Sequence, residues 1–283
     1  MSETWALISD IHGNIDALDA VLEDMAQHDI DQVVVLGDII NYGGAPRECV
    51  ERITAVADVL ILGNHEYALL EETSQGMVGA AGAGLSYAAH ALADCEAWQA
   101  LVSETSFPES AESMFRGVQL VHGSPRDPVR EYVWPGNSQY FLPFNEKLDQ
   151  RLAQMLAART SQHCLCGHTH IPAVLVPYEA RRIFQGQGWS RHHTFVGPQT
   201  MFWVPNGNSI LEGLSAYPAI LNPGSVGQPR DGSPEASYAL YDGDRLCFRR
   251  VPYDVAAAQA RILALPIAPE IRRYLAERLA RGE

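Results

Sequence analysis

Five short polar segments of the chain carry residue types that bind metal ions. They are Asp10-Ile11-His12, Gly37-Asp38, Gly63-Asn64-His65-Glu66, His122-Gly123 and Gly167-His168-Thr169-His170. Carboxylate, amide and imidazole groups without thiolate suit Mn, Fe, Co, Ni or Zn better than a cysteine-rich structural zinc site or an all-oxygen calcium site. Seven such donors are too many for one tetrahedral ion. The pattern therefore predicts two divalent transition-metal ions that share a carboxylate.

Taken singly, each segment also has a purely structural explanation. Asp-x-His often occurs by chance, Gly-Asp commonly caps a turn, and one histidine such as His122 more often satisfies a strand end than binds a metal. Gly-His-Thr-His is more informative, because two histidines on a glycine-loosened backbone rarely serve packing. All five segments follow predicted strands, and ligands of open α/β sheets bind beyond the carboxyl ends of the strands. We therefore expect the segments to converge on one crevice.

The elements that must position these segments alternate between strand and helix. Short apolar runs predict strands at residues 5–9, 32–36, 59–62, 118–121 and 163–166. Between them, helical spacing of apolar residues from Asn14, a helix start near Pro46, an Ala- and Gly-rich stretch at 76–103 and a segment ending near Arg159 predict helices. Such alternation is typical of βαβ units and a mainly parallel sheet.

After residue 170 the pattern changes to short β-rich runs. They lie at 173–176, 182–184, 194–196, 201–204, 219–221, 237–241 and 246–251, and Asp242-Gly243 predicts a hairpin between the last two. This half is expected to form a second, largely antiparallel sheet. Two helices from about Asp254 and Pro269 close the chain. No linker or repeat is visible, so we expect one domain over 1–283, with 253–283 as a helical tail packed on it.

The five segments together resemble the calcineurin-like metallophosphoesterase superfamily, which carries D-x-H, G-D, G-N-H-[DE], H and G-H-x-H blocks. The resemblance covers residues 5 to about 230 and includes Asn222-Pro223-Gly224-Ser225 after the last block. It implies an α/β fold, a four-layer αββα sandwich of two mixed β-sheets flanked by helices, with the metals at one edge.

The resemblance also implies a role for each residue of the site. Asp10, His12 and His170 would hold the first metal, Asn64, His122 and His168 the second, and Asp38 would bridge both. His65 would stand beside the phosphoryl group rather than bind metal. Two cations roughly 3.5–4 Å apart can share a hydroxide and neutralise charge in the transition state. His65 is then the available group to protonate the leaving oxygen, because imidazole titrates near neutral pH.

One departure from the superfamily narrows the expected substrate. Ser/Thr protein phosphatases carry G-D-x-x-D-R-G, whose Arg binds phosphate, whereas this chain has Asn41 and Tyr42 in place of the second Asp and the Arg. The chain is more similar to the bacterial and archaeal members. We expect a small phosphorylated substrate, a phosphodiester or a nucleotide-type polyphosphate. A broad phosphomonoesterase is the alternative, and the filled ligand positions disfavour a non-catalytic scaffold such as the related retromer subunit.

Composition restricts the partners of the protein. The 283 residues carry a net charge of −14, which disfavours a stable complex with long nucleic acid. Five scattered cysteines and an N-terminus without a signal-peptide pattern indicate a reducing, cytoplasmic location. No apolar run is long enough to cross a membrane. Manganese is the metal we expect first, and the oligomeric state stays open.

Other residues are candidates for substrate contact. They are Tyr42, Arg126 and Arg230, although a surface ion pair between Arg126 and Asp127 explains Arg126 equally well. The stretch 178–203 combines aromatic residues with Arg181, Arg182, Arg191, His192 and His193. Such a mixture can stack a base and hold its phosphates, but a β-hairpin with one packed and one solvated face is the preferred interpretation.

Overall fold

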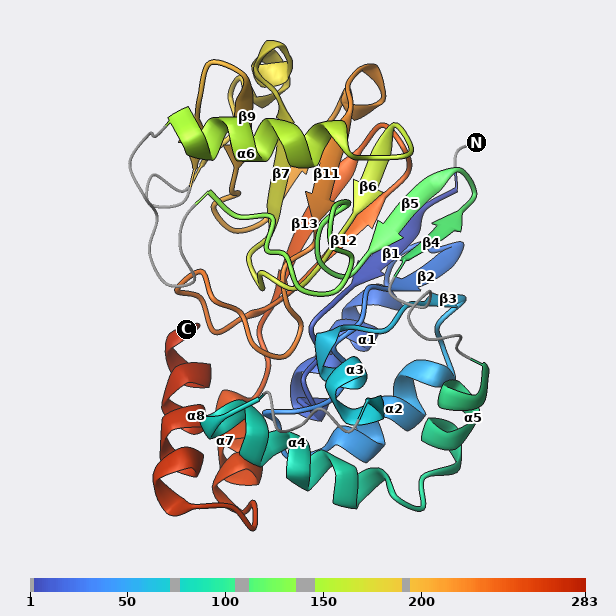
Figure 1. Cartoon of the computed structure of the whole chain (residues 1–283), viewed down its shortest axis with the longest axis vertical. Coiled ribbons are helices and arrows are strands. Elements are labelled where there is room, and N and C mark those ends of the chain that lie inside the picture. The colour runs from blue at the N-terminus through green and yellow to red at the C-terminus, as the bar shows by residue number, and fades with distance from the viewer. Residues whose placement is uncertain (1–2, 72–76, 105–111, 136–145, 190–193) are drawn as a thin grey trace.

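The strands form two sheets that pack face to face, and helices cover both outer faces (Figure 1). This computed structural model describes residues 3–71, 77–104, 112–135, 146–189 and 194–283. In order across the first sheet, the strands are β10 (Ser209–Leu211), β13 (Leu246–Val251), β12 (Ala236–Tyr241), β1 (Trp5–Ile8), β2 (Gln32–Val35) and β3 (Val59–Leu60). In the second sheet they are β4 (Glu112–Phe115), β5 (Val118–Val121), β6 (His163–Leu165), β11 (Ala219–Asn222), β7 (Ala173–Pro177), β9 (Thr200–Trp203) and β8 (Phe195–Val196). These two mixed sheets confirm the predicted fold class.

Each sheet takes strands from both halves of the chain, so the predicted division into an early parallel and a late antiparallel sheet is wrong. β1 runs parallel to β2 on one side and antiparallel to the late strand β12 on the other. In the second sheet, β6 runs parallel to β5 and β11. The pattern of a strand indicates which of its faces are buried, and it carries little information on the neighbour. The parallel βαβ run β1-β2-β3 is present as expected.

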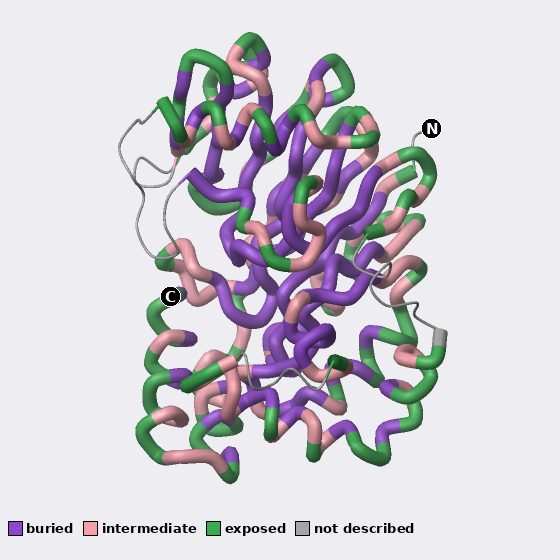
Figure 2. Tube along the Cα trace, in the orientation of Figure 1, coloured by how far each residue is buried: buried purple, intermediate pink, exposed green. Residues whose placement is uncertain are grey.

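Side chains of the central strands alternate between two cores. Leu7 and Val34 lie between the sheets, where they join Leu165, Leu221 and Phe248. The alternate side chains of β1 face the helices on the outer side of the first sheet. Figure 2 shows these strands as a continuous buried region through the centre of the molecule. A strand that is buried on both faces consists of apolar residues, so the polar segments of the site begin only after the strand has ended.

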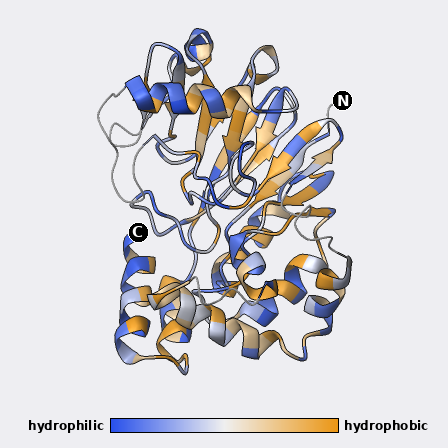
Figure 3. Cartoon of the chain, viewed as in Figure 1, coloured by the Kyte–Doolittle hydropathy of each residue, from blue (hydrophilic) through white to orange (hydrophobic). Residues whose placement is uncertain are grey.

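The first outer layer consists of α1 (Ile15–Met25), α2 (Pro46–Thr54), α3 (Asn64–Leu70), α4 (Gly79–Leu92) and α5 (Glu96–Glu104). α1 and α2 follow the predicted apolar spacing, whereas α3 was not predicted and the helical stretch expected at 76–103 forms two helices. The Asn14 side chain accepts a hydrogen bond from the Ala17 N–H, which caps α1. Apolar residues of α1 then turn toward the sheet and polar ones outward, as the mixed colouring of these helices in Figure 3 illustrates.

The remaining helices cover the other sheet and the C-terminal side. α6 (Glu146–Ala157) packs on the second sheet. The predicted tail forms α7 (Val255–Leu263) and α8 (Pro269–Arg281), of which α7 contacts α1 and α8 contacts α4. Within the described ranges, no helix is both long and apolar enough to cross a bilayer.

Several short elements differ from the prediction. The run 182–184 belongs to the 3-10 helix η3 (Tyr178–Phe184), not to a strand, and the edge strands β4 and β10 were not predicted. Edge strands are exposed on one side and therefore lack a long apolar run. The hairpin at Asp242-Gly243 is confirmed, because the Asp242 carboxylate accepts hydrogen bonds from the N–H groups of Asp244 and Arg245.

The aromatic stretch 178–203 is largely a packing element. Four of its aromatic side chains are buried, namely Phe184, Phe195, Phe202 and Trp203. Arg181 lies over the ring of Tyr178, and Arg182 bonds the Tyr217 hydroxyl. Arg191, His192 and His193 lie outside the described residues. The described part is a 3-10 helix followed by the β8–β9 hairpin, and β9 is buried along its whole length, so the predicted hairpin with one packed and one solvated face is only partly present.

Candidate metal centre

The five predicted segments meet at one edge of the sandwich, where β1, β2, β3, β5 and β6 end. Two groups of donor atoms lie within 4.8 Å of one another: Asp10, His12, Asp38 and His170 in the first, and Asp38, His122 and His168 in the second. All six residues are buried. The two groups share Asp38, the residue that the resemblance assigns to the bridge between two metals.

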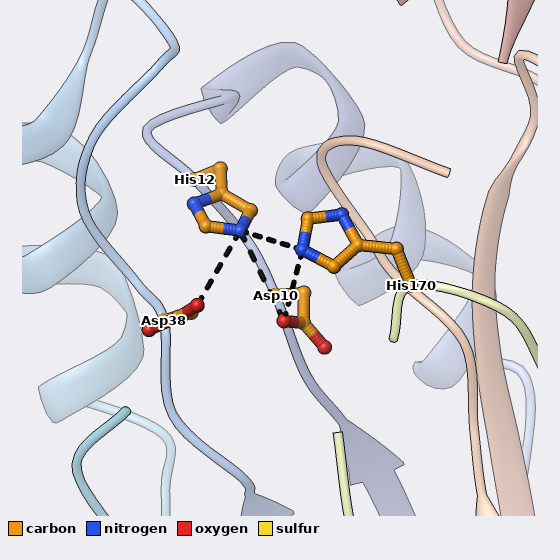
Figure 4. Close-up of side chains that lie close together, drawn as sticks. All are labelled: Asp10, His12, Asp38 and His170. Carbon is orange, nitrogen blue, oxygen red and sulfur yellow. Dashed lines mark hydrogen bonds and ion pairs between the residues drawn. The ribbon is translucent and has the colours of Figure 1, made fainter. Parts of the chain in front are cut away.

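The first group surrounds a small space at the end of β1 (Figure 4). The Nε2 atom of His170 lies 3.2 Å from Asp10 Oδ1, and the Nε2 atom of His12 lies 3.9 Å from Asp10 Oδ1 and 3.6 Å from Asp38 Oδ2. The two Nε2 atoms lie 3.0 Å from each other. Four donor residues from the loops after β1, β2 and β6 thus lie around a common centre.

The tautomers of these two histidines are fixed by the backbone. The Nδ1–H of His12 donates to the Ile40 carbonyl at 3.0 Å, and that of His170 donates to the Gln228 carbonyl at 2.6 Å. The Nε2 atoms therefore carry lone pairs that face each other, an arrangement that repels unless a cation lies between them. Burial lowers the pKa of both imidazoles well below the ordinary value, which keeps them neutral and ready to bind metal.

The second group contains one histidine that differs in its binding atom. His122 donates from Nδ1 to the Leu36 carbonyl at 2.7 Å, which leaves Nε2 at 3.0 Å from Asn64 Oδ1 and 3.2 Å from Asp38 Oδ2. His168 instead donates from Nε2 to the Arg130 carbonyl at 3.1 Å. Its Nδ1 atom is therefore the one available for a metal, a distinction that the sequence does not contain.

Asp38 provides the test of whether these residues fit a metal pair. Its Oδ2 atom is buried and accepts no hydrogen bond from the described residues. Yet the Nε2 atoms of His122, His12 and His65 lie only 3.2, 3.6 and 3.8 Å from it. A buried carboxylate oxygen without a hydrogen bond needs a positive charge nearby. In the metal-free protein, against the effect of burial, the Asp38 charge raises the pKa of His122 to about 9, so a proton on His122 supplies that charge where a divalent cation would otherwise lie. The donor set and this oxygen both fit divalent cations.

The backbone around these ligands is strained. Eight non-glycine residues in the described ranges have positive φ, and Arg116 alone is far from the site. The others, with φ between 50° and 78°, are Asp10, His12, Asp38, Asn41, Tyr42, His168 and His170. Left-handed conformations of L-residues are unfavourable and persist where the surrounding structure imposes them, often at functional sites.

Glu66 clamps two of the segments together, a role that the sequence analysis did not assign. Its buried carboxylate accepts hydrogen bonds from the N–H groups of Asp38, Ile39, Ile40 and Gly63 at 2.8–3.1 Å. Burial and the Asp38 charge raise the pKa of Glu66 to about 7, against the effect of these donors. Glu66 thus fixes the loop that carries Asp38 to the helix that carries Asn64 and His65. Its position in G-N-H-[DE] was the available signal.

The predicted Asn222–Ser225 segment supports the ligands from the opposite side. Asn222 donates from Nδ2 to the Gly167 carbonyl at 2.6 Å and to the Thr169 hydroxyl at 2.8 Å. The Ser225 hydroxyl donates to the Asp10 carbonyl at 2.7 Å. This segment therefore connects the loop after β1 with the loop after β6.

His65 lies at the site with its Nε2 side toward Asp38. The Asn41 side chain fixes the His65 tautomer: its Oδ1 accepts from the Tyr42 N–H at 2.6 Å, so its Nδ2 must face His65 Nδ1 at 2.6 Å. Nδ1 accepts that hydrogen bond, and the ring proton is on Nε2. Burial lowers the pKa of His65 to about 4 in the metal-free protein. His65 is thus a neutral donor here, whereas the sequence analysis expected a group that titrates near neutral pH.

Aromatic rings and one arginine form the rim of the site. The Tyr42 ring lies 4.8 Å from that of His12 and 4.9 Å from that of His65, and the Tyr132 ring stacks on His168 at 4.0 Å. The Arg230 N–H donates to the His170 carbonyl at 3.2 Å. Burial is the largest cause that lowers the pKa of His12, His65 and His168, and the charge of Arg230 lowers it further. Tyr42 and Arg230 therefore border the site, and their contact with substrate stays a prediction.

Arg126 is held away from such a role by its partners. Its guanidinium pairs with Glu131 and donates to Gln154 at 3.0 Å. The sequence suggested Asp127 as the ion-pair partner of Arg126, but the partner is Glu131. Asp127 instead accepts hydrogen bonds from the N–H groups of Val129 and Arg130 within its own turn.

Comparisons with known proteins agree with this geometry. The family description "calcineurin-like phosphoesterase superfamily domain" matches residues 4–245. A solved metallophosphoesterase from Sphaerobacter thermophilus is 30% identical, with a TM-score of 0.74 over 100% of both chains. An uncharacterized protein of Methanocaldococcus jannaschii is 29% identical over 98% of this chain and 97% of its own. The chain belongs to the calcineurin-like phosphoesterase superfamily, whose members are metal-dependent phosphoester hydrolases.

Proposed function

We propose that this protein is a two-metal phosphoester hydrolase that acts on small phosphodiesters or nucleotide-type polyphosphates. The observation that carries this proposal is the shared Asp38, whose unpartnered Oδ2 faces histidines of both ligand groups. Asp10, His12 and His170 would hold one cation, Asn64, His122 and His168 would hold the other, and Asp38 would serve both. Manganese is the metal we expect in both positions.

The chain's own residues supply binding, orientation and a hydrogen-bond donor. Two bound cations would provide a water-derived nucleophile at neutral pH and neutralise charge on the phosphoryl oxygens. His65 presents its Nε2–H toward the same space, held there by Asn41. An anionic phosphoryl group beside His65 raises the affinity of this imidazole for a second proton. His65 then donates either a hydrogen bond to the phosphoryl group or a proton to the leaving oxygen.

The rim supports a small substrate in place of a phosphoprotein. Tyr42 occupies the position at which protein phosphatases of this superfamily place a phosphate-binding Arg, and its ring is packed against His12 and His65. Tyr132 stacks one face of its ring on His168, and the residue is 37% exposed. A partly exposed aromatic ring at the rim suits an aryl or nucleoside group of a diester or polyphosphate.

A panel of substrates tests the proposal. Protein freed of metal with a chelator should regain activity when Mn²⁺ is added and should contain two ions per chain by elemental analysis. A diester such as bis(4-nitrophenyl) phosphate or a dinucleoside tetraphosphate should be turned over faster than phosphoserine peptides. Faster turnover of phosphomonoesters than of any diester or polyphosphate would favour the broad phosphatase instead. No turnover of any ester with full metal content would overturn the enzyme assignment.

A further inference from the structure

The C-terminal helix α8 brings an arginine to the rim from outside the part of the chain that the family description covers. That description ends at residue 245, and α8 spans Pro269–Arg281. Leu275 and Leu279 of α8 line a cavity of about 10 Å³ together with His12 and Tyr42. Tyr42 also packs against the apolar cluster of α7 and α8. One face of α8 therefore reaches the wall of the metal centre.

The last turn of α8 is docked on the loop that carries Arg230. The Gly232 N–H donates to the Gly282 carbonyl at 3.0 Å. Gly282 has φ +65°, and a Cβ there would collide with the backbone of Ser233. Figure 1 shows this end of α8 beside the loop that follows β11. This contact sets the position of Arg278, which precedes Gly282 by one helical turn.

Arg278 lies beside Leu279 on α8, one turn before the contact between Gly282 and Gly232, so the docking of α8 brings Arg278 toward the loop that carries Arg230. Burial lowers the pKa of Arg278, and the charge of Arg230 lowers it further. Burial raises the pKa of Tyr42, and the charges of Arg230 and Arg278 act in the opposite direction. Two like charges that are both partly buried repel each other, so this arrangement has a cost that an anion would remove.

Neither arginine has a carboxylate partner among the described residues. Arg230 donates to Gln228 Oε1 at 3.1 Å, and its Nε atom is buried without a hydrogen-bond partner. Arg278 lies over the ring of Tyr274. The nearby Glu283 is paired with Arg281 at 3.0 Å. In a chain with a net charge of −14, acidic groups are abundant, yet none of those that the structure describes forms an ion pair with these two cations.

We propose that Arg230 and Arg278 form a subsite that binds a second phosphate of the substrate, next to the phosphoryl group held at the metal centre. Two guanidinium groups match the paired oxygens of a phosphate better than they match a neutral group. The inference rests on the proposed function and narrows it. The preferred substrates carry two adjacent phosphates, as nucleoside polyphosphates do, and simple diesters lack the group that this subsite binds.

Binding of two inhibitors to the metal-loaded protein tests the subsite without turnover. Methylenediphosphonate carries two anionic groups and inorganic phosphate carries one. By calorimetry, Arg278→Gln should weaken methylenediphosphonate roughly 10-fold and phosphate less than about twofold, as expected for loss of one charge-assisted contact. Arg278→Lys should retain part of the affinity. Arg273→Gln, an exposed position on the same helix, is the matched control and should change neither.

Kinetics separate failure of this inference from failure of the proposed function. Arg278→Gln should lower kcat/KM for diadenosine tetraphosphate roughly 10-fold and leave that for bis(4-nitrophenyl) phosphate within about twofold. One outcome is that the unaltered protein turns over both substrates while Arg278→Gln lowers kcat/KM equally for both, or for neither. That result would contradict the subsite and leave the proposed hydrolase function intact. If the unaltered protein binds two metals and turns over neither, the proposed function itself is wrong. A lowered melting temperature in Arg278→Gln but not in Arg278→Lys, with unchanged inhibitor binding in both, would assign Arg278 a purely structural role.

Discussion

The two halves of the metal centre use similar ligands but differ in charge. The half around Asp10 combines a carboxylate of its own with the shared Asp38, whereas the half around Asn64 has only the shared carboxylate and a neutral amide. Their histidines differ as well. Burial leaves those of the first half neutral, while the Asp38 and Asp10 charges outweigh burial and raise the pKa of His122 to about 9. Ligand charge tunes cation affinity, so the half around Asn64 should hold its cation more weakly.

The largest expected effect comes from the residue common to both halves. Asp38→Asn removes the shared charge, so both cations should be bound weakly and turnover should fall to near background. Elemental analysis and activity with added Mn²⁺ measure this. Asp149→Asn is the control, because Asp149 is equally buried but bonds Thr200 away from the site. Retention of two ions and a near-normal rate in Asp38→Asn would show that the halves do not share this ligand.

His65 belongs to neither half, so its removal should separate chemistry from metal binding. His65→Ala should keep both ions and lose roughly 10²- to 10⁴-fold in rate, the usual contribution of a positioned proton donor. The loss should be far greater for alkyl or nucleoside esters than for nitrophenyl esters, whose leaving groups need little protonation. Equal losses would indicate that His65 binds the phosphoryl group by a hydrogen bond alone. His28→Ala, three residues after the end of α1, serves as control. Loss of metal in His65→Ala would make His65 a ligand.

Replacement of Glu66 tests whether metal binding depends on the hydrogen bonds that connect the loop after β2 with α3. Glu66→Gln places amide hydrogens against backbone N–H donors, so about 2 kcal/mol of unfolding free energy should be lost. Metal affinity should fall roughly 10- to 100-fold, as for other groups that orient ligands. Chemical denaturation and metal titration measure the two effects. The exposed Glu96→Gln on α5 should show neither effect. An unchanged metal affinity would mean that the loop after β2 keeps its place without the clamp.

The smallest and most specific effect is a difference in pH dependence between the halves. Burial raises the pKa of Asp10 to about 7, and that of His122 is about 9 in the metal-free protein. Asp10 is about half deprotonated at pH 7 and almost fully so at pH 8, so the first half changes its affinity by only about twofold between pH 7 and 9, whereas the second half must release a proton from His122. Affinity for the more weakly held cation should therefore rise roughly tenfold per pH unit in this window, and that for the other should stay nearly constant. Metal titrations at pH 7, 8 and 9 measure both affinities. Equal changes of affinity with pH for the two cations would contradict the comparison.

Much of the site could be predicted from the sequence because its signals are local. Asp10, Asp38, His122 and the two histidines after β6 stand where apolar strands end, and the ends of parallel strands meet at one edge whichever sheet holds them. This is why the ligands converge even though the predicted partition of the strands was wrong. The sheet partners depend on long-range packing, which no local pattern records.

The residues that escaped prediction act through tertiary contacts. Arg278 lies on an ordinary amphipathic helix and reaches the rim only because α8 docks on the loop at Gly232. The choice of Nδ1 in His168 depends on the carbonyl of Arg130, and the His65 tautomer depends on Asn41. The run 182–184 has strand-like residues but continues from β7 into η3, because the chain must turn there before β9 pairs with β7.

The left-handed backbone of the loops that carry the candidate metal ligands implies a conflict between thermal stability and activity. Each such conformation costs an L-residue on the order of 1 kcal/mol, a penalty that glycine escapes. Variants selected only for resistance to heat should therefore accumulate glycine at positions such as Asn41 and Tyr42, where φ is 78° and 59°. Those variants would lose the amide that orients His65 and the ring beside His12. Screens for thermostable forms of this enzyme should accordingly retain an activity criterion at these two positions.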